Sequence, residues 1–157
     1  MSLSGKQLLQ LIDEAYDHKA WHGPNLKGSL RGVDVKTALW RPSARRHNIW
    51  EIALHAAYWK YAVRRRVLHE KRGSFAFKGS NRFARDRSWT LTAWSDDRRL
   101  LEEEHQRLRT VIADLDDEFL AHTLPGRKER FIHLLQGIAC HDVYHAGQIQ
   151  LLKRMAR

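Results

Sequence analysis

Apolar residues recur every three or four positions in four long stretches of the chain, which is the spacing of one face of an α-helix. The predicted helices cover residues 6–22, 48–71, 92–114 and 128–155. Gly23 and Pro24 end the first stretch, and Pro125 and Gly126 precede the last one, as expected where helices stop and restart. The pattern therefore predicts an all-α protein built as a four-helix bundle.

The second predicted helix is apolar on nearly all sides between Ile49 and Val63, so we expect it to be the most buried helix of the bundle. The connections that flank it, residues 23–47 and 72–91, exceed the about two to eight residues usual between antiparallel neighbours. Each is long enough to cross the end of the bundle or to lie over a site. Asp34 is suited to open a short helix within the first connection.

The composition indicates a folded domain and constrains its surroundings. The 157 residues are 43% apolar and 10% aromatic, which is ample for a core, and we expect one domain covering residues 1–157. Cys140 is the single cysteine, which forbids an internal disulfide and fits a reducing compartment. The N-terminal stretch lacks the pattern of a signal peptide, and no apolar run approaches the length of a membrane span. A cytoplasmic protein without a membrane partner is the expectation.

Positive charge is concentrated in one part of the chain. Lys and Arg number 28 against 18 Asp and Glu, which gives a formal net charge of +10. Nine basic residues lie between Arg64 and Arg87, where only Glu70 and Asp86 oppose them. A basic surface attracts nucleic acids, acidic membranes or small anionic substrates, and the sign of the charge does not choose among them.

Two histidines of the last predicted helix have the spacing of a metal-binding pair. His141 and His145 are four residues apart, which places their imidazoles on one helix face. Both lie in the apolar stripe that runs from Leu134 to Leu152, where adjacent imidazoles are costly to bury without partners. The position favours metal ligands. The alternative is a pair of core histidines with other hydrogen-bond partners.

A catalytic metal site needs a third ligand from a facing helix and an open position for water or substrate. His55 is the best candidate, because it lies midway along the most apolar helix, where an imidazole is hardly solvated. His22 ends the stripe of the first helix, where it either faces the mouth of the bundle as a site residue or is an ordinary helix-end histidine. Weaker candidates, placed at helix ends, among charges or on outward faces, are His47, His69, His105 and His133.

The motifs HNIWEIALHAAYWKY in the second helix and GIACHDVYHAGQIQLLKR in the fourth resemble those of the DinB-like (DinB/YfiT-like) family. The resemblance implies a four-helix bundle that binds one divalent metal ion per chain through His55, His141 and His145. Zinc, nickel, manganese, iron and copper all suit three imidazoles. The family includes thiol S-transferases, a maleylpyruvate isomerase and proteins regarded as metal-dependent hydrolases. The resemblance therefore implies a particular set of metal ligands but no single reaction.

The leading hypothesis is a metal-dependent enzyme that activates a thiol or a water molecule for transfer or hydrolysis. Arginine pairs with carboxylates through two parallel hydrogen bonds, so Arg82, Arg85 and Arg87 are candidates for holding a small anionic or thiol substrate. No general base stands out in the sequence. The candidate helpers near the metal are His22, Gln148 and Tyr144.

Two other functions remain open at this point. A nucleic-acid binder would use the basic segment, whose interleaved aromatic side chains could stack on bases, although no known nucleic-acid-binding motif is present. A non-catalytic metal-binding or structural bundle is the other alternative, and an open coordination position counts against a purely structural metal.

The aromatic residues outnumber what the core of one bundle needs, so some are expected to line an interface. They are Trp50, Trp59, Trp89, Trp94, Phe75, Phe77 and Phe83. A symmetric homodimer is the commonest soluble oligomer and is therefore the prediction.

Overall fold

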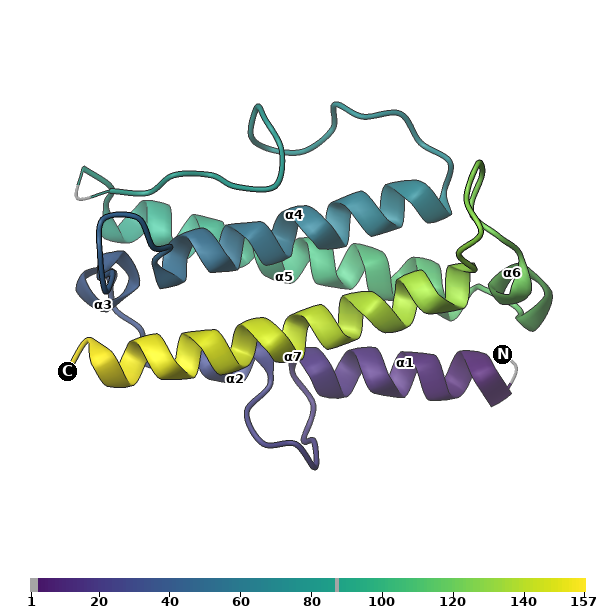
Figure 1. The fold of residues 1–157 in the computed structure, drawn as a ribbon, viewed down its shortest axis with the longest axis horizontal. Coiled ribbons are helices and arrows are strands. Elements are labelled where there is room, and N and C mark those ends of the chain that lie inside the picture. The colour runs from purple at the N-terminus through teal and green to yellow at the C-terminus, as the bar shows by residue number, and fades with distance from the viewer. Residues whose placement is uncertain (1–2, 87) are drawn as a thin grey trace.

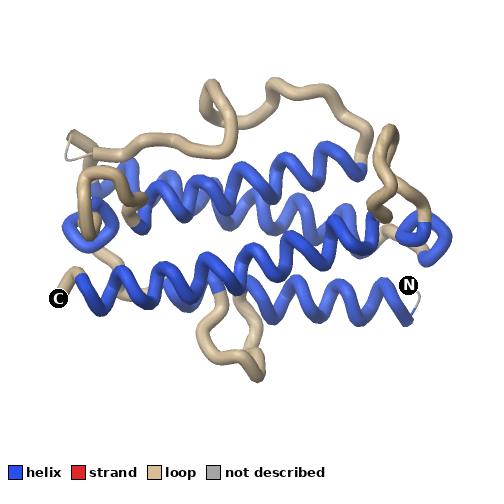
Figure 2. The backbone as a smooth tube through the Cα atoms, in the orientation of Figure 1, coloured by secondary structure: helices blue, strands red, loops and turns tan. Residues whose placement is uncertain are grey.

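The computed structural model describes residues 3–86 and 88–157, and within them seven helices and no strand are present (Figures 1 and 2). Four long helices pack side by side: α1 Leu3–Tyr16, α4 Ile49–Val67, α5 Leu91–Ala113 and α7 Phe131–Met155. Three short helices lie in the connections: α2 Leu26–Ser29, α3 Val35–Leu39 and α6 Asp117–Ala121. The predicted all-α class is confirmed. Among the described residues, no helix combines the length and the apolar character that crossing a membrane requires.

Side-chain caps fix the start of several helices, α3 and α4 among them. The Asn48 side chain accepts a hydrogen bond from the Glu51 backbone N–H at 2.8 Å, and the Glu51 carboxylate accepts one from the Asn48 N–H at 3.4 Å. This reciprocal pair satisfies two backbone donors that a helix otherwise leaves free at its start. Asp34 opens α3, as predicted, by accepting the N–H of Thr37 at 2.8 Å.

The first helix is shorter than the apolar pattern predicts. α1 ends at Tyr16, because the His18 carbonyl accepts a hydrogen bond from the Asn25 side chain at 2.7 Å. Asn25 also caps α2 by accepting the N–H of Gly28 at 2.8 Å. A contact with the following loop thus replaces the last predicted turns. The prediction that His22 lies on the bundle face is wrong, since His22 lies exposed in this loop.

α4 is the most buried long helix, as predicted, and it packs against α3, α5 and α7. Two of the tryptophans expected at an interface belong to this core. Trp50 donates its indole N–H to Asp97 at 2.7 Å, and Trp94 donates its own to the Val33 carbonyl at 2.9 Å. Both side chains are therefore satisfied within one chain.

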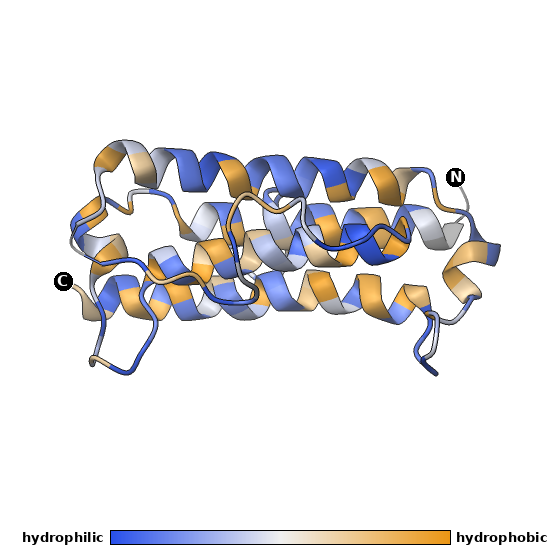
Figure 3. Cartoon of the chain, turned by 90° about the horizontal axis from the view of Figure 1, so that it is seen from above, coloured by the Kyte–Doolittle hydropathy of each residue, from blue (hydrophilic) through white to orange (hydrophobic). Residues whose placement is uncertain are grey.

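The connection between α4 and α5, residues 68–90, lies along the outer face of α4 (Figures 1 and 3). An aromatic cluster holds its middle. Its members are Phe75, Phe77 and Phe83 of the loop and Tyr58 and Tyr61 of α4, with neighbouring ring centroids 5.3 to 5.9 Å apart. These phenylalanines pack against the chain itself, so the loop is a covering layer of the bundle.

Arg85 anchors the end of the same loop. Its Nε donates to Asp97 at 3.0 Å, and its guanidinium lies 3.9 Å from the centroid of the Trp89 ring. Its backbone N–H donates to Glu51 at 3.1 Å, and Glu51 also accepts from Arg41 at 2.7 Å. Arg85 is only 5% exposed. Although the sequence made it a candidate substrate ligand, Arg85 has a structural role that fixes the loop over α4.

Candidate metal centre

His55, His141 and His145 meet between the antiparallel helices α4 and α7 (Figure 1). The Nε2 atom of His141 lies 3.0 Å from Nε2 of His55 and 3.1 Å from Nε2 of His145. The candidate ligand atoms of the three residues all lie within 4.8 Å of one another. The three histidines singled out in the sequence therefore form a cluster that could hold a metal ion.

Hydrogen bonds on the far side of two rings set their orientation. His55 Nδ1 lies 2.7 Å from the Asn81 carbonyl oxygen, and His145 Nδ1 lies 2.7 Å from Oε1 of Gln148. Both oxygens only accept, so each Nδ1 carries the hydrogen and each Nε2 keeps its lone pair. Metal-binding histidines are usually held in this way by a carbonyl or carboxylate behind them.

The cluster fits a divalent metal ion. Of the three Nε2 atoms, only that of His141 can carry a hydrogen, so at most one hydrogen lies among them. The other ring nitrogen of His141, Nδ1, is buried without a hydrogen-bond partner among the described residues. A metal ion would accept all three lone pairs. In a tetrahedral zinc site with Zn–N bonds of about 2.0–2.1 Å, the nitrogens are about 3.3 Å apart. The observed 3.0 and 3.1 Å need to widen by only a few tenths of an ångström.

Burial keeps these imidazoles neutral, which is the form that binds metal. Removal from water, with a smaller contribution from the nearby Arg82 charge, lowers the pKa of His55 to about 4. Burial, reinforced by the other two imidazoles, lowers the pKa of His141 to about 3. The pKa of His145 is also lowered, chiefly by burial. All three rings are therefore ready to bind a cation near neutral pH.

A groove with a volume of about 460 Å³ lies near the cluster, although none of the three histidines is among the residues that line it. Gln148 lines it and connects it to His145 through their hydrogen bond. Arg82 lines it from the long loop, and Ile52 lines it from α4. The cluster is thus next to a space that a small molecule can enter.

The structure brings some of the predicted substrate and helper residues to this place and leaves others away from it. Gln148 bonds His145, and its Nε2 donates to the Tyr144 hydroxyl at 3.0 Å. Arg82 is exposed at the groove. Arg87 lies outside the described residues.

Asn81 is a residue of the site that sequence reasoning missed. Its backbone φ is +66°, and its carbonyl accepts from His55 while its side chain accepts from the Trp59 indole N–H at 2.9 Å. Asparagine adopts this left-handed conformation more readily than most residues. The run Gly79, Ser80, Asn81 is a turn signal in the sequence, but it does not reveal which carbonyl faces the histidine.

His105 corrects a sequence expectation. It was placed on an outward face, yet it is fully buried and stacks on Tyr16 with ring centroids 3.7 Å apart. The sequence signal was available, because Leu101, Leu108 and Ile112 share its helix face at intervals of three and four residues. His105 is not part of the metal-ligand cluster.

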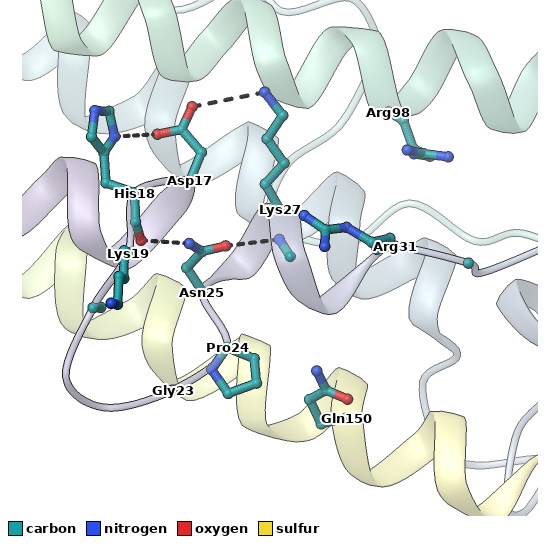
Figure 4. Close-up of a pocket in the computed structure, with 13 residues that line it drawn as sticks. Asp17, His18, Lys19, Gly23, Pro24, Asn25, Lys27, Arg31, Arg98 and Gln150 are labelled. Carbon is teal, nitrogen blue, oxygen red and sulfur yellow. Dashed lines mark hydrogen bonds and ion pairs between the residues drawn. The ribbon is translucent and has the colours of Figure 1, made fainter.

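A larger cavity, of about 640 Å³, lies beside the loop between α1 and α2 (Figure 4). Its lining includes neither the three clustered histidines nor a side chain that bonds one of them, as Gln148 does in the groove. Asp17 there is bonded to His18 at 2.8 Å and pairs with Lys27 at 3.7 Å. Among the described residues, no second group of three potential metal ligands is present. Size alone therefore does not mark the functional site.

A family model described as the DinB superfamily matches residues 20–149. The matched stretch contains α4 and the part of α7 up to Ile149, with all three histidines, and it leaves out α1. Comparison with curated proteins and with solved structures gives no match. Because the family model covers most of the chain and includes the helices that carry the cluster, the chain belongs to the DinB superfamily.

Proposed function

We propose that the protein is a metal-dependent enzyme that acts on a small anionic or thiol substrate by transfer or hydrolysis. The observation that carries the proposal is the convergence of three neutral Nε2 atoms, on the buried His55 and His145 and the half-buried His141, near a groove that Gln148 lines. His55, His141 and His145 would hold one divalent ion. Bound by three neutral imidazoles, such an ion supplies Lewis acidity that makes a water molecule or a thiol nucleophilic near neutral pH.

The residues around the cluster have separable roles in this proposal. The Asn81 carbonyl and the Gln148 side chain hold His55 and His145 with their Nε2 atoms pointing inward. Arg82 supplies positive charge at the groove, which attracts an anion. The Tyr144 hydroxyl accepts from Gln148, so its own proton is free to bond a substrate oxygen.

The nucleic-acid hypothesis has less support from the structure than from the sequence. Phe75, Phe77 and Phe83, which were expected to stack on bases, contact one another and α4. Arg85 is buried against Asp97. A non-catalytic metal-binding bundle differs from the proposed enzyme only in having no substrate, so a ligand response at the metal separates these two functions.

The test is cobalt substitution of the protein, followed by titration with low-molecular-weight thiols and carboxylates. An enzyme of the proposed kind shows a changed cobalt absorption spectrum with at least one compound, and Arg82→Gln raises the apparent dissociation constant without removing cobalt. Arg99→Gln, an exposed substitution on α5, is the control. A spectrum that no compound changes, together with salt-sensitive DNA binding by metal-free protein, would favour the nucleic-acid binder.

A further inference from the structure

The groove beside the histidines differs at its two ends. Along α7, Gln148 follows His145 by about one turn, Leu152 by about two, and Met155 by about three. Ten residues of helix separate His145 from Met155, a length of about 15 Å. The groove therefore leads from the cluster towards the C-terminal end of α7, and Met155 lines its far part.

The residues of α4, which form the other wall of the groove, indicate the same direction for the groove. α4 runs antiparallel to α7, so the chain before α4 lies near the end of α7 (Figure 1). Ile52 lines the groove about one turn from His55, and Arg46 lines it just before α4 begins. Gln148, which bonds His145, and Arg46 thus line opposite ends of the groove.

The floor between these ends is apolar. Ile52 and Leu152 lie in the core beneath the groove, whereas Leu151 and Met155 are 59% and 51% exposed at its side. Exposed large apolar side chains next to a hollow favour a ligand with an apolar body, because they leave water when it binds.

The far end carries positive charge that the chain does not neutralise. The Arg46 side chain has no acidic partner among the described residues, and the bonds of Arg46 involve its backbone: its N–H donates to Ser43 at 3.0 Å and its carbonyl accepts from Arg41 at 2.8 Å. Glu51, the acid at the start of α4, is already bonded to Arg41 and His47. Arg46 is therefore free to form a two-pronged contact with a carboxylate.

We propose that the groove binds an elongated small acid with an apolar body, whose carboxylate is held by Arg46 and whose reacting end lies beside Arg82 and the three histidines. The position of the reacting end rests on the proposed metal-dependent function. The recognition of the ligand rests on the groove alone. The proposal names a substrate class, a monocarboxylic acid about as long as the groove, and makes Arg46 a specificity-determining residue.

Octanoate tests the recognition, with octanol and acetate as probes that lack the carboxylate or the apolar body. Calorimetry is performed on the protein as purified and after removal of metal with a chelator, so that a carboxylate bound to metal is not mistaken for one bound to Arg46. The expected result in both forms is that octanoate binds at least tenfold more tightly than either other probe.

Variants locate the carboxylate and the apolar body of the ligand. Arg46→Gln is expected to weaken octanoate about tenfold, and Leu151→Glu to weaken it at least as much. Arg31→Gln, an exposed change in the larger cavity of Figure 4, should have no effect. Circular dichroism checks that each variant is folded.

Three results would overturn the inference: no octanoate binding, acetate binding as tight as octanoate, or a loss caused by Arg82→Gln and not by Arg46→Gln. The last would place the anion at the histidine end. If octanoate binding depends on Arg46 while the protein holds no metal, the recognition stands and the proposed function fails. If the cobalt spectrum responds to thiols while Arg46→Gln leaves octanoate binding unchanged, the proposed function stands and the proposed recognition fails.

Discussion

Lys60 of α4 and Asp142 of α7 form an ion pair inside the bundle, each side chain being only 1% exposed. The pair joins the two helices that carry the three histidines, and Asp142 directly follows His141 in the chain. Lys60 Nζ also lies 4.8 Å from the centroid of the Tyr16 ring, a cation–π distance. This contact fixes the rotation of α7 against α4 and with it the direction of the His141 ring.

Removal of one partner leaves the other charge buried and unpaired. Lys60→Met is therefore expected to lower the free energy of unfolding by about 3–5 kcal/mol. The double variant Lys60→Met/Asp142→Leu should lose clearly less than the sum of the single changes. Urea unfolding measures both. Arg99→Gln breaks the exposed contact with Asp96 and should cost about 1 kcal/mol or less. Additive losses in the double variant would show that the pair is not coupled.

Gln148 is expected to act on the metal through His145. Gln148→Leu removes the acceptor behind Nδ1 and should weaken metal binding by about 10- to 100-fold, as measured by competition with a coloured chelator. Gln148→Glu keeps an acceptor and should restore most of the affinity. Gln150→Leu, on the same helix but beside the other cavity, is the matched control. Equal affinities of Gln148→Leu and wild type would remove Gln148 from the site.

His105 makes stability depend on pH. Burial, with a contribution from the Lys60 charge, lowers its pKa from 6.5 to about 2. Above pH 6.5 the ring is neutral in both the folded and the unfolded chain, so it contributes no pH dependence. As the pH falls below 6.5, only the unfolded chain takes up the proton, and folding loses about 1.4 kcal/mol per pH unit until the folded pKa is reached.

His105→Phe should therefore reduce the loss of stability between pH 8 and pH 5 by about 2 kcal/mol. Phenylalanine suits the place, because neither ring nitrogen has a hydrogen-bond partner among the described residues and the ring stacks on Tyr16. Urea unfolding at the two pH values measures the difference. An unchanged dependence on pH would mean that His105 is solvated in the folded protein.

Self-association is still predicted, but now from exposed apolar side chains instead of the number of aromatic residues. Trp50 and Trp94 lie in the core, so they no longer argue for an interface. Trp21, however, is fully exposed at 101%, and Leu91 is 70% exposed. We expect a homodimer at micromolar concentration in sedimentation velocity, and Trp21→Ser or Leu91→Ser should shift the boundary towards monomer. A single monomeric boundary for the wild type at all concentrations would contradict this.

The three-histidine cluster followed from the sequence because it depends on helix periodicity. His141 and His145 share a face by spacing alone, and His55 was the one histidine in the middle of an apolar helix. The contacts around them depend on the loop, where periodicity carries no information. The carbonyl of Asn81 reaches His55 only because Arg85 and the aromatic cluster fix residues 68–90 over α4.

Two other residues were misplaced. Arg85 lies in the loop, so its error has the same origin, whereas the periodicity of α5 already put His105 on the apolar face. Each is buried by a partner far away in the chain. For Arg85 that partner includes Glu51, and for His105 it is Tyr16. Sequence patterns report which face of a helix is apolar, whereas burial of a polar side chain depends on tertiary partners.

The metal content of protein purified without a histidine tag tests the central claim most directly. The wild type is expected to contain about one divalent ion per chain, and His55→Ala, His141→Ala and His145→Ala should each lose most of it. His69→Ala and His133→Ala, which change exposed histidines, should keep it; His105 is unsuitable as a control because it is buried. A wild type without metal, or a His55→Ala variant with its full content, would contradict the three-histidine site.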